Sequence, residues 1–386
     1  MGKKYNMYLY DISLEVGIIL LLINKFSKII EVLTNSFLAS NYIYWLGILL
    51  VILAALLKGI SCIEILLIIY GCVSFILIHD ATLFSFLVLT ITVKKSNMDN
   101  ILRLFLRIQV LVLSICIIVY PVLLELGSPY AKISYITGRS VTRYNFFFSH
   151  PNNFAIQCVF TVLAYIYLYR DKLSYYKTNI IILFLILFLL IFPKSQTAVI
   201  VLIIYLVVRF MIKYAKLIWK PFIKFLFPII SVCISILVYM NYKGMEFPFL
   251  DYIMGTFSAR FSGAAMSFHI YKVNLFGNYL NEIGNTLYID GQWNTFWFDL
   301  AYIRMLVAFG IVGAFIFYYI FLKGLIMHMR EKNYMVLSLL VVVMVYAISE
   351  WTAFSTMTVF PLLFCNIVFQ SEDKNSNIKK IRIKMR

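Results

Sequence analysis

Residues 300–321 read LAYIRMLVAFGIVGAFIFYYIF, an apolar run in which Arg304 is the only charged side chain. A helix needs roughly 20 such residues to cross a bilayer. Comparable runs recur along the 386-residue chain, which is 63% hydrophobic and 13% charged, with a mean hydropathy of +0.91. Soluble domains are about half apolar and about a quarter charged. The composition therefore excludes a water-soluble fold and predicts a polytopic integral membrane protein.

Twelve membrane-spanning helices are predicted, and residues 1–386 are expected to form a single membrane domain. The fourth and seventh spans are shorter than a bilayer requires, so we expect them to be tilted, joined to a neighbour or interrupted. The predicted fold class is all-α, with two larger outer loops that are partly helical. The expected spans cover residues 7–23, 41–57, 60–78, 81–93, 106–124, 152–169, 179–193, 196–212, 225–241, 300–321, 335–349 and 354–369.

The positions of lysine and arginine indicate the orientation of the chain. With the N-terminus inside, 24 of the 34 Lys and Arg residues fall in inner segments, including the basic tail at 371–386, and ten fall on the outer side. Because basic residues stay on the cytoplasmic side, this split predicts that both termini are cytoplasmic. The same sorting accounts for most of the net charge of +17, so nucleic acid is not expected as a partner.

Two long outer loops, residues 125–151 and 242–299, hold most of the polar residues suited to chemistry. They carry Arg, His, Asp, Asn and Trp above apolar helices, which suits a substrate with a lipid tail and a polar head. The sequence has no Gly-rich phosphate loop and no Asp-x-Asp pair, and its four His and six Cys lack metal-ligating spacing. We therefore expect neither a metal nor a cofactor.

The first outer loop ends at a predicted helix start. Pro151 suits the first turn of the helix at 152–169, which leaves Ser149 or His150 as the cap, beside unpaired backbone N–H groups that attract anions. The positive end of a helix disfavours a charged imidazole, so His150 is a candidate general base. The alternative is that His150 merely caps the helix.

Three further cations on the outer side are candidate anion ligands. Arg139 and Arg143 are four residues apart and would share one face of a local helix, although they could instead pair with outer carboxylates such as Glu125. Lys194 lies in the short turn before the helix at 196–212. Its side chain could reach a headgroup phosphate or simply extend to the membrane interface.

The second outer loop carries Arg260, whose guanidinium fork matches phosphate bidentately. A salt bridge to Asp251 or another carboxylate is the alternative. Trp293 and Trp297 suit stacking on sugar faces, although aromatic residues at a membrane boundary often form only a belt. Glu350, at the outer end of the eleventh helix, is expected to be solvated. The candidate acceptors of sugar hydroxyl groups are Asp290, Asn294 and Asp299.

Short motifs occur in a distinctive order. They are Phe147-Phe-Ser149-His150-Pro151-Asn152 after a basic loop, Pro193-Lys-Ser195-Gln-Thr197, Ser258-Ala-Arg260, and Asp290 with Asn294 before a helix that contains Gly310-Ile-Val-Gly313. In this order, with twelve spans and a large penultimate outer loop, the chain resembles the bacterial Wzy-type O-antigen and capsular polysaccharide polymerases. The resemblance covers nearly the whole chain.

The resemblance implies a glycosyltransferase of the bacterial cytoplasmic membrane that joins polyprenyl-pyrophosphate-linked oligosaccharide repeat units on its outer face, without metal or nucleotide. The product would be a capsule, an exopolysaccharide or an O-antigen. A flippase and a chain-length regulator of the same pathway are the implied partners, with membrane lipid around the protein. In this interpretation His150 is the general base. The implied pyrophosphate ligands are Arg260, Arg143, Arg139 and Lys194, and the implied sugar ligands are Asp290, Asn294, Trp293, Trp297, Asp299 and Asn152.

Three other functions remain open. An O-antigen-type ligase would use the same donor and a different acceptor. A lipid-linked oligosaccharide flippase would also have about twelve helices, but related halves and short loops on both sides are expected of a transporter. A channel or ion-coupled transporter should place ionisable residues in the middle of its spans, which this sequence mostly does not.

Overall fold

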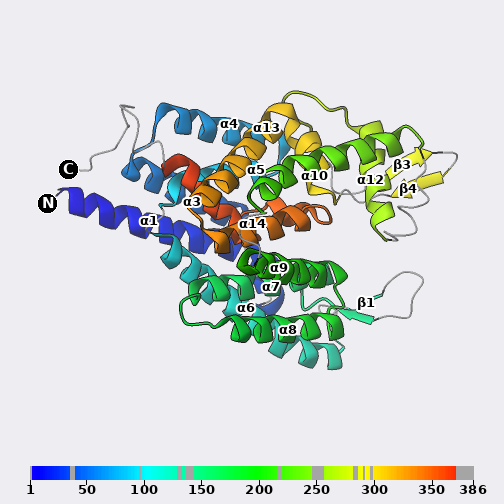
Figure 1. Ribbon diagram of the computed structural model, residues 1–386, viewed down its shortest axis with the longest axis horizontal. Helices are drawn as coiled ribbons and strands as arrows, with labels where there is room; N and C mark the ends of the chain where they lie inside the picture. The colour runs from blue at the N-terminus through cyan, green and yellow to red at the C-terminus, as the bar shows by residue number, and fades with distance from the viewer. Residues whose placement is uncertain are drawn as a thin grey trace. The chain divides into compact units, whose positions relative to one another are not determined.

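The structure is a computed structural model that describes residues 2–34, 40–94, 97–127, 133–135, 142–214, 219–245, 256–280, 286–289, 292–295 and 299–370. Within these residues the fold is all-α apart from two antiparallel two-stranded hairpins, β1–β2 and β3–β4 (Figure 1). The strands are β1 (Ile133–Tyr135), β2 (Thr142–Tyr144), β3 (Thr286–Ile289) and β4 (Gln292–Thr295).

Helices account for the rest of the regular structure. The α-helices are α1 (Gly2–Lys25), α2 (Ser27–Thr34), α3 (Ser40–Lys58), α4 (Cys62–Ile78), α5 (Thr82–Thr92), α6 (Met98–Glu125), α7 (Pro151–Leu168), α8 (Tyr175–Ile191), α9 (Gln196–Tyr214), α10 (Trp219–Tyr242), α12 (Thr256–Ile270), α13 (Ala301–Arg330) and α14 (Tyr334–Tyr346). Two 3₁₀-helices follow, η2 (Trp351–Phe354) and η3 (Phe360–Asn366).

Five of the described helices are long and apolar enough to cross a membrane. They are Asn6–Lys25 in α1, α3, α6, Phe225–Tyr242 in α10, and α13. Shorter apolar helices include α4, α5, α8 and α14. On α8 the large apolar side chains of Leu183, Phe184 and Leu187 are 53%, 70% and 55% exposed. Contiguous exposed apolar surface of this kind is typical of a membrane-facing helix, so the chain has the helices of a membrane protein.

A described helix coincides with each of the first eleven expected spans, whereas the twelfth differs. The region expected to form a single span at 354–369 contains a turn after η2, then the 3₁₀-helix η3, and becomes α-helical only at 367–370. Pro361 is the second residue of η3, and it cannot donate a backbone hydrogen bond to a preceding α-helical turn. The number of membrane crossings stays a prediction.

The described helices fall into two compact units that are interleaved along the sequence. Among the described residues, one unit comprises those within 2–61 and 91–210, and the other comprises those within 62–90 and 211–370. We call the first unit 1 and the second unit 2.

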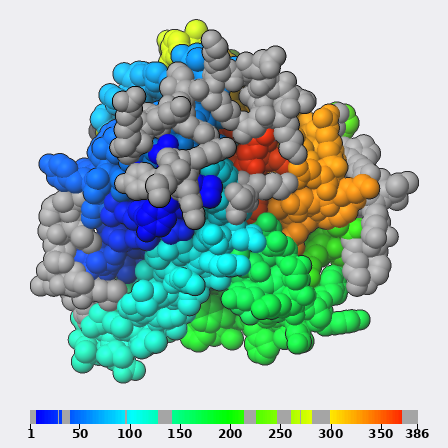
Figure 2. All heavy atoms as spheres, turned by 90° about the vertical axis from the view of Figure 1, so that its left-hand side faces the viewer, coloured from blue at the N-terminus to red at the C-terminus, as the bar shows by residue number. Residues whose placement is uncertain are grey.

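Unit 1 is built around α1, α3, α6 and α7. Gly17 of α1 lies so close to α3 that an added Cβ would come within 2.9 Å of the Gly47 carbonyl oxygen, and small residues of this kind let helix backbones approach closely. Figure 2 shows α1, in dark blue, lying directly against α6, in cyan. The helix α7 is largely buried although it carries polar residues, and Gln157 accepts a 2.6 Å hydrogen bond from the Lys25 ammonium group.

Unit 2 is organised around α13, which packs against α10, α14, η2 and η3. The helix is interrupted at Gly310, whose backbone angles are φ 69° and ψ −176°. The segment at 274–278 pairs with the interruption: Asn278 N–H donates to the Ala308 carbonyl at 2.9 Å, and Ile311 N–H donates to the Asn274 carbonyl at 3.0 Å. The inserted segment therefore satisfies backbone groups that the break in the helix would otherwise leave unpaired.

Candidate functional site

His150 caps the N-terminus of α7, as the sequence predicts. Its backbone is extended, with φ −145° and ψ 144°, and Pro151 occupies the first helical position. The imidazole Nδ1 accepts a 3.1 Å hydrogen bond from the backbone N–H of Asn152. A neutral imidazole that accepts at Nδ1 carries its proton on Nε2. The capping residue His150 is therefore a hydrogen-bond donor at Nε2. Its lone pair on Nδ1 is occupied by the hydrogen bond from the Asn152 N–H.

The same helix end gathers residues from three separate segments of unit 1. Arg143, in β2, donates from Nη2 to the Asn152 amide oxygen at 2.6 Å and from Nε to the Pro193 carbonyl at 3.0 Å. The Ser195 hydroxyl donates to the same Asn152 oxygen at 2.9 Å. Two motifs singled out in the sequence, at 147–152 and 193–197, thus meet around one amide group. We call Arg143, His150, Asn152 and Ser195 the α7 cluster.

More of the backbone N–H groups at the start of α7 are hydrogen-bonded than the sequence predicts. The Asn152 N–H is bonded to the His150 ring, and the Asn153 N–H donates to the His150 carbonyl at 3.0 Å. An anion that approached the helix end would therefore meet the Arg143 guanidinium, and it would compete with His150 for the Asn152 N–H. Asn152, expected to bind sugar, holds Arg143 and Ser195 in place in this structure.

Arg260 lies on α12 in unit 2 and is largely buried. Its guanidinium is ion-paired with Glu350 at 3.1 Å and also donates to the Ser349 carbonyl, beyond the C-terminal end of α14. Glu350 was expected to be solvated; instead its side chain is 9% exposed. A carboxylate partner for Arg260 was the alternative raised by the sequence. Glu350 provides it, while Asp251 lies outside the described residues.

Asp299 lies just before α13, close to two arginines. Burial raises the pKa of the Asp299 carboxyl above its ordinary value, and the positive charges of Arg260 and Arg304 partly oppose that rise. Arg304 is itself ion-paired with Asp80 at 3.4 Å. Two guanidinium groups and three carboxyl groups thus lie in this part of unit 2, so the cationic charge there is matched by acidic groups rather than in excess.

The remaining predicted site residues lie in a turn, in β4 or outside the described residues. Lys194 is half-buried in the turn between α8 and α9, in the left-handed backbone region at φ 49°. Asn294 and Trp293 lie in β4, opposite Leu287 and Tyr288 of β3. Arg139, Asp290 and Trp297 lie outside the described residues, as does the basic tail at 371–386.

Sequence reasoning did not single out Ser195, Glu350 or Arg304 as individual site residues. Ser195 belongs to the motif at 193–197, so that motif did indicate this part of the site. The partners of Arg260 and Arg304 are 90 and 224 residues away in the sequence, and no local pattern indicates such pairs.

Comparison with protein-family models, with curated proteins and with solved structures finds no significant match.

Proposed function

We propose that this protein is a polysaccharide polymerase of the bacterial cytoplasmic membrane, with both termini in the cytoplasm. It would join polyprenyl-pyrophosphate-linked oligosaccharide repeat units on the outer face. The observation that carries the proposal is the α7 cluster, in which two motifs of polymerase-like sequence meet beside a histidine and an arginine. That combination offers a group able to exchange a proton and a cation suited to phosphate.

The proposed reaction is a glycosyl transfer. The bond between the acceptor hydroxyl oxygen and the anomeric carbon of the growing glycan forms, and the bond from that carbon to pyrophosphate breaks. The hydroxyl proton passes to His150, and polyprenyl pyrophosphate leaves with the electron pair of the broken bond. The two demands on the protein are a proton acceptor for the hydroxyl and positive charge for the leaving group.

His150 can accept a proton only after its Nδ1 is released from the hydrogen bond that caps α7. While Nδ1 accepts from the Asn152 N–H, the neutral ring has no lone pair available for a substrate proton. A phosphate oxygen that took over the Asn152 N–H would release Nδ1, because backbone N–H groups at helix ends bind anions well. Arrival of the anionic donor would thereby turn the capping histidine into a base.

The cations have the complementary role. Arg143, held by Asn152 and the Pro193 carbonyl, would bind the pyrophosphate, together with Arg139 and Lys194. Arg260 keeps a phosphate-binding role in the proposal, with a phosphate oxygen replacing the Glu350 carboxylate as its partner. The sugar-binding roles proposed for Asp299, Asp290, Asn294, Trp293 and Trp297 rest on residue type and resemblance.

Reconstitution tests the proposal. Purified protein would be incubated with lipid-linked repeat units extracted from cells that lack it, and the products separated by length. We expect a ladder of polymer from the natural protein and mostly single units from Arg143→Ala. The Arg143 guanidinium makes two hydrogen bonds in a fixed fork, which a lysine ammonium does not reproduce. We therefore expect Arg143→Lys to make little more polymer than Arg143→Ala. Arg170→Ala is the matched control, since Arg170 lies past the other end of α7 in an exposed ion pair with Asp99.

The outcomes separate the candidate functions. Transbilayer movement of the units without elongation would identify a flippase and refute the polymerase. Transfer of the glycan to a different acceptor would indicate a ligase. If Arg143→Ala still made polymer of the natural lengths, the α7 cluster would have no part in the reaction. The polymerase function itself would not be refuted by that result.

A further inference from the structure

The segment that pairs with the break in α13 combines a fixed backbone with exposed apolar side chains. The Asn274 side-chain oxygen accepts hydrogen bonds from the backbone N–H groups of Phe276 and Gly277, which closes a turn. Gly277 lies so close to α13 that an added Cβ would collide with the Ala308 carbonyl group. At this turn the side chains of Leu275 and Phe276 are 57% and 62% exposed. Two large apolar groups are thus held at the surface by a backbone that is fixed against α13.

The exposed face of α13 begins at the same break. From Ala301 to Gly310 every residue of the helix is buried or half-buried. Beyond the break Ile311, Phe315 and Tyr319 are exposed, and their spacing of four residues puts them on one side of the helix. Because α13 is long and apolar enough to cross a membrane, this stripe has the character of a lipid-facing surface.

The exposed turn continues that stripe. The Ile311 N–H donates to the Asn274 carbonyl at 3.0 Å, and the Val312 N–H donates to the Leu275 carbonyl at 3.1 Å. This backbone pairing puts the turn directly beside the first exposed residue of α13. A surface that contacts lipid along α13 therefore extends onto the segment 274–278, although hydropathy assigns this segment to the large outer loop.

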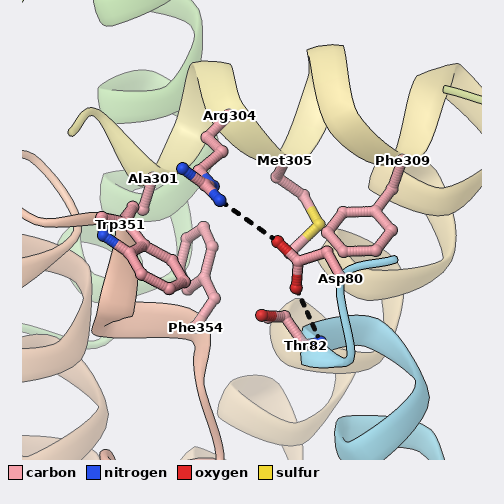
Figure 3. Close-up of a pocket in the computed structure, with 8 residues that line it drawn as sticks. All are labelled: Asp80, Thr82, Ala301, Arg304, Met305, Phe309, Trp351 and Phe354. Carbon is pink, nitrogen blue, oxygen red and sulfur yellow. Dashed lines mark hydrogen bonds and ion pairs between the residues drawn. The ribbon is translucent and has the colours of Figure 1, made fainter. Parts of the chain in front are cut away.

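Charged groups indicate where the hydrocarbon core ends along α13. Arg330 lies in the last turn, and a core of roughly 30 Å takes about 20 helical residues, which reaches back to about Gly310. On the other side of the break Arg304 is ion-paired with Asp80 at 3.4 Å, and Figure 3 shows its side chain directed from α13 toward Asp80. An ion pair is costly inside the core. The turn at 274–278 therefore lies at the boundary of the core and not within it, where irregular backbone is allowed.

We propose that residues 272–279 are an interfacial anchor, which inserts Leu275 and Phe276 among the acyl chains of the phospholipid leaflet beside the N-terminal end of α13. This is the outer leaflet in the predicted orientation. Lys272 is exposed just before the turn, and its ammonium group extends to the lipid phosphates. Tyr279 is also exposed, and its amphipathic ring suits the same depth. The inference rests on α13 crossing the membrane and does not depend on the polymerase activity.

Spin labels in lipid vesicles test the anchor. The purified full-length protein, with its six cysteines replaced, would carry one nitroxide-labelled cysteine and be reconstituted in phosphatidylethanolamine and phosphatidylglycerol. Dissolved oxygen concentrates among acyl chains, whereas a charged-ligand nickel chelate stays in water, so relaxation of the label by each reports its surroundings. We expect oxygen to relax labels at Leu275→Cys and Phe276→Cys several-fold more than nickel does, as at Phe315→Cys on the exposed stripe. Glu331→Cys, at the exposed C-terminal end of the same helix, should show the reverse.

Two results would overturn the anchor. Labels at 275 and 276 that nickel relaxes as strongly as the label at 331 would place the segment in water. Labels that neither reagent reaches would show that protein covers the turn, and spectral broadening that disappears on dilution with unlabelled protein would identify a second copy as the cover. Unchanged elution and thermal unfolding show that a variant is folded. If both variants of the turn fail to fold, Val273→Cys, a smaller change at an exposed position of the same segment, is judged by the same criteria.

Discussion

At the scale of single residues, His150 shows how a local pattern can be predicted while its chemical consequence cannot. The order Ser-His-Pro placed a cap at residues 149–150, and the structure confirms His150 in that position. Which ring nitrogen the cap engages depends on the three-dimensional turn. Because Nδ1 is the acceptor, proton acceptance and capping compete for one lone pair.

Substitution by asparagine separates these two tasks. Asparagine is a good N-cap, so His150→Asn should keep the stability of the natural protein, whereas His150→Ala should lose about 1 kcal/mol. Asparagine cannot accept a proton near neutral pH, so both variants should lose polymerisation by about 100-fold or more. Thermal unfolding and the ladder assay measure the two effects. Full polymer length from His150→Asn would show that the histidine serves only as a cap.

Asp299 carries a pH-dependent prediction. Its pKa is raised by burial, so the folded state disfavours the ionised carboxylate, and stability is lost as pH rises through the folded-state pKa. Asp299→Asn removes that charge. We expect the variant to unfold at a higher temperature than the natural protein at pH 8, with the difference shrinking as pH falls toward the ordinary Asp value of about 3.9. A difference independent of pH would contradict the proposed cause.

The residue scale also marks a limit of sequence reasoning. The sequence indicated that Arg260 needs an anionic partner, but hydropathy placed Glu350 at a solvated helix end. The structure buries Glu350 against Arg260 across 90 residues of sequence. A pairing of this range depends on how α12 lies against the segment that follows α14, which composition and periodicity do not encode.

At the scale of elements, α13 shows both what hydropathy predicts and what it misses. The predicted span at 300–321 begins one residue before the observed helix, which continues to Arg330. The prediction ended early because Lys323 follows the apolar run. It could not foresee the break at Gly310, because that break depends on backbone pairing with the distant segment 274–278.

Gly310 should therefore tolerate no side chain. Its φ of 69° with ψ near 180° is a region that glycine alone populates readily, and an added Cβ would collide with the backbone of Leu275 and Gly277. Gly310→Ala should destabilise the protein by about 2 kcal/mol or more, measured by thermal or denaturant unfolding in detergent. Gly324→Ala on the same helix is the control, since its Cβ would approach Cys365 no closer than 3.3 Å. Equal losses in the two variants would refute the strained interruption.

At the scale of the whole molecule, the proposed function depends on which side of the membrane the α7 cluster faces. Sorting of Lys and Arg predicts that the start of α7 is outside and its end is inside. The 18 residues of α7 give a length of about 27 Å, close to the roughly 30 Å thickness of the hydrocarbon core. The helix is less apolar than a simple span, because Asn152, Asn153 and Gln157 make contacts within unit 1. Although α7 has about the length of a span, it is not among the five described helices that are both long and apolar enough to cross a membrane, so its crossing stays a prediction.

Two exposed serines on either side of α7 make the orientation testable. Ser149 precedes the helix and Ser174 follows it. In a variant whose six cysteines are replaced, Ser149→Cys should react with a membrane-impermeant maleimide in intact cells, and Ser174→Cys should react only after permeabilisation. The physical reason is the 24-to-10 division of basic residues, which favours retention of the Ser174 side in the cytoplasm. One span more or fewer before α7 would reverse both results. Such a reversal would place His150 and Arg143 in the cytoplasm, where a reaction on externalised lipid-linked glycans could not use them.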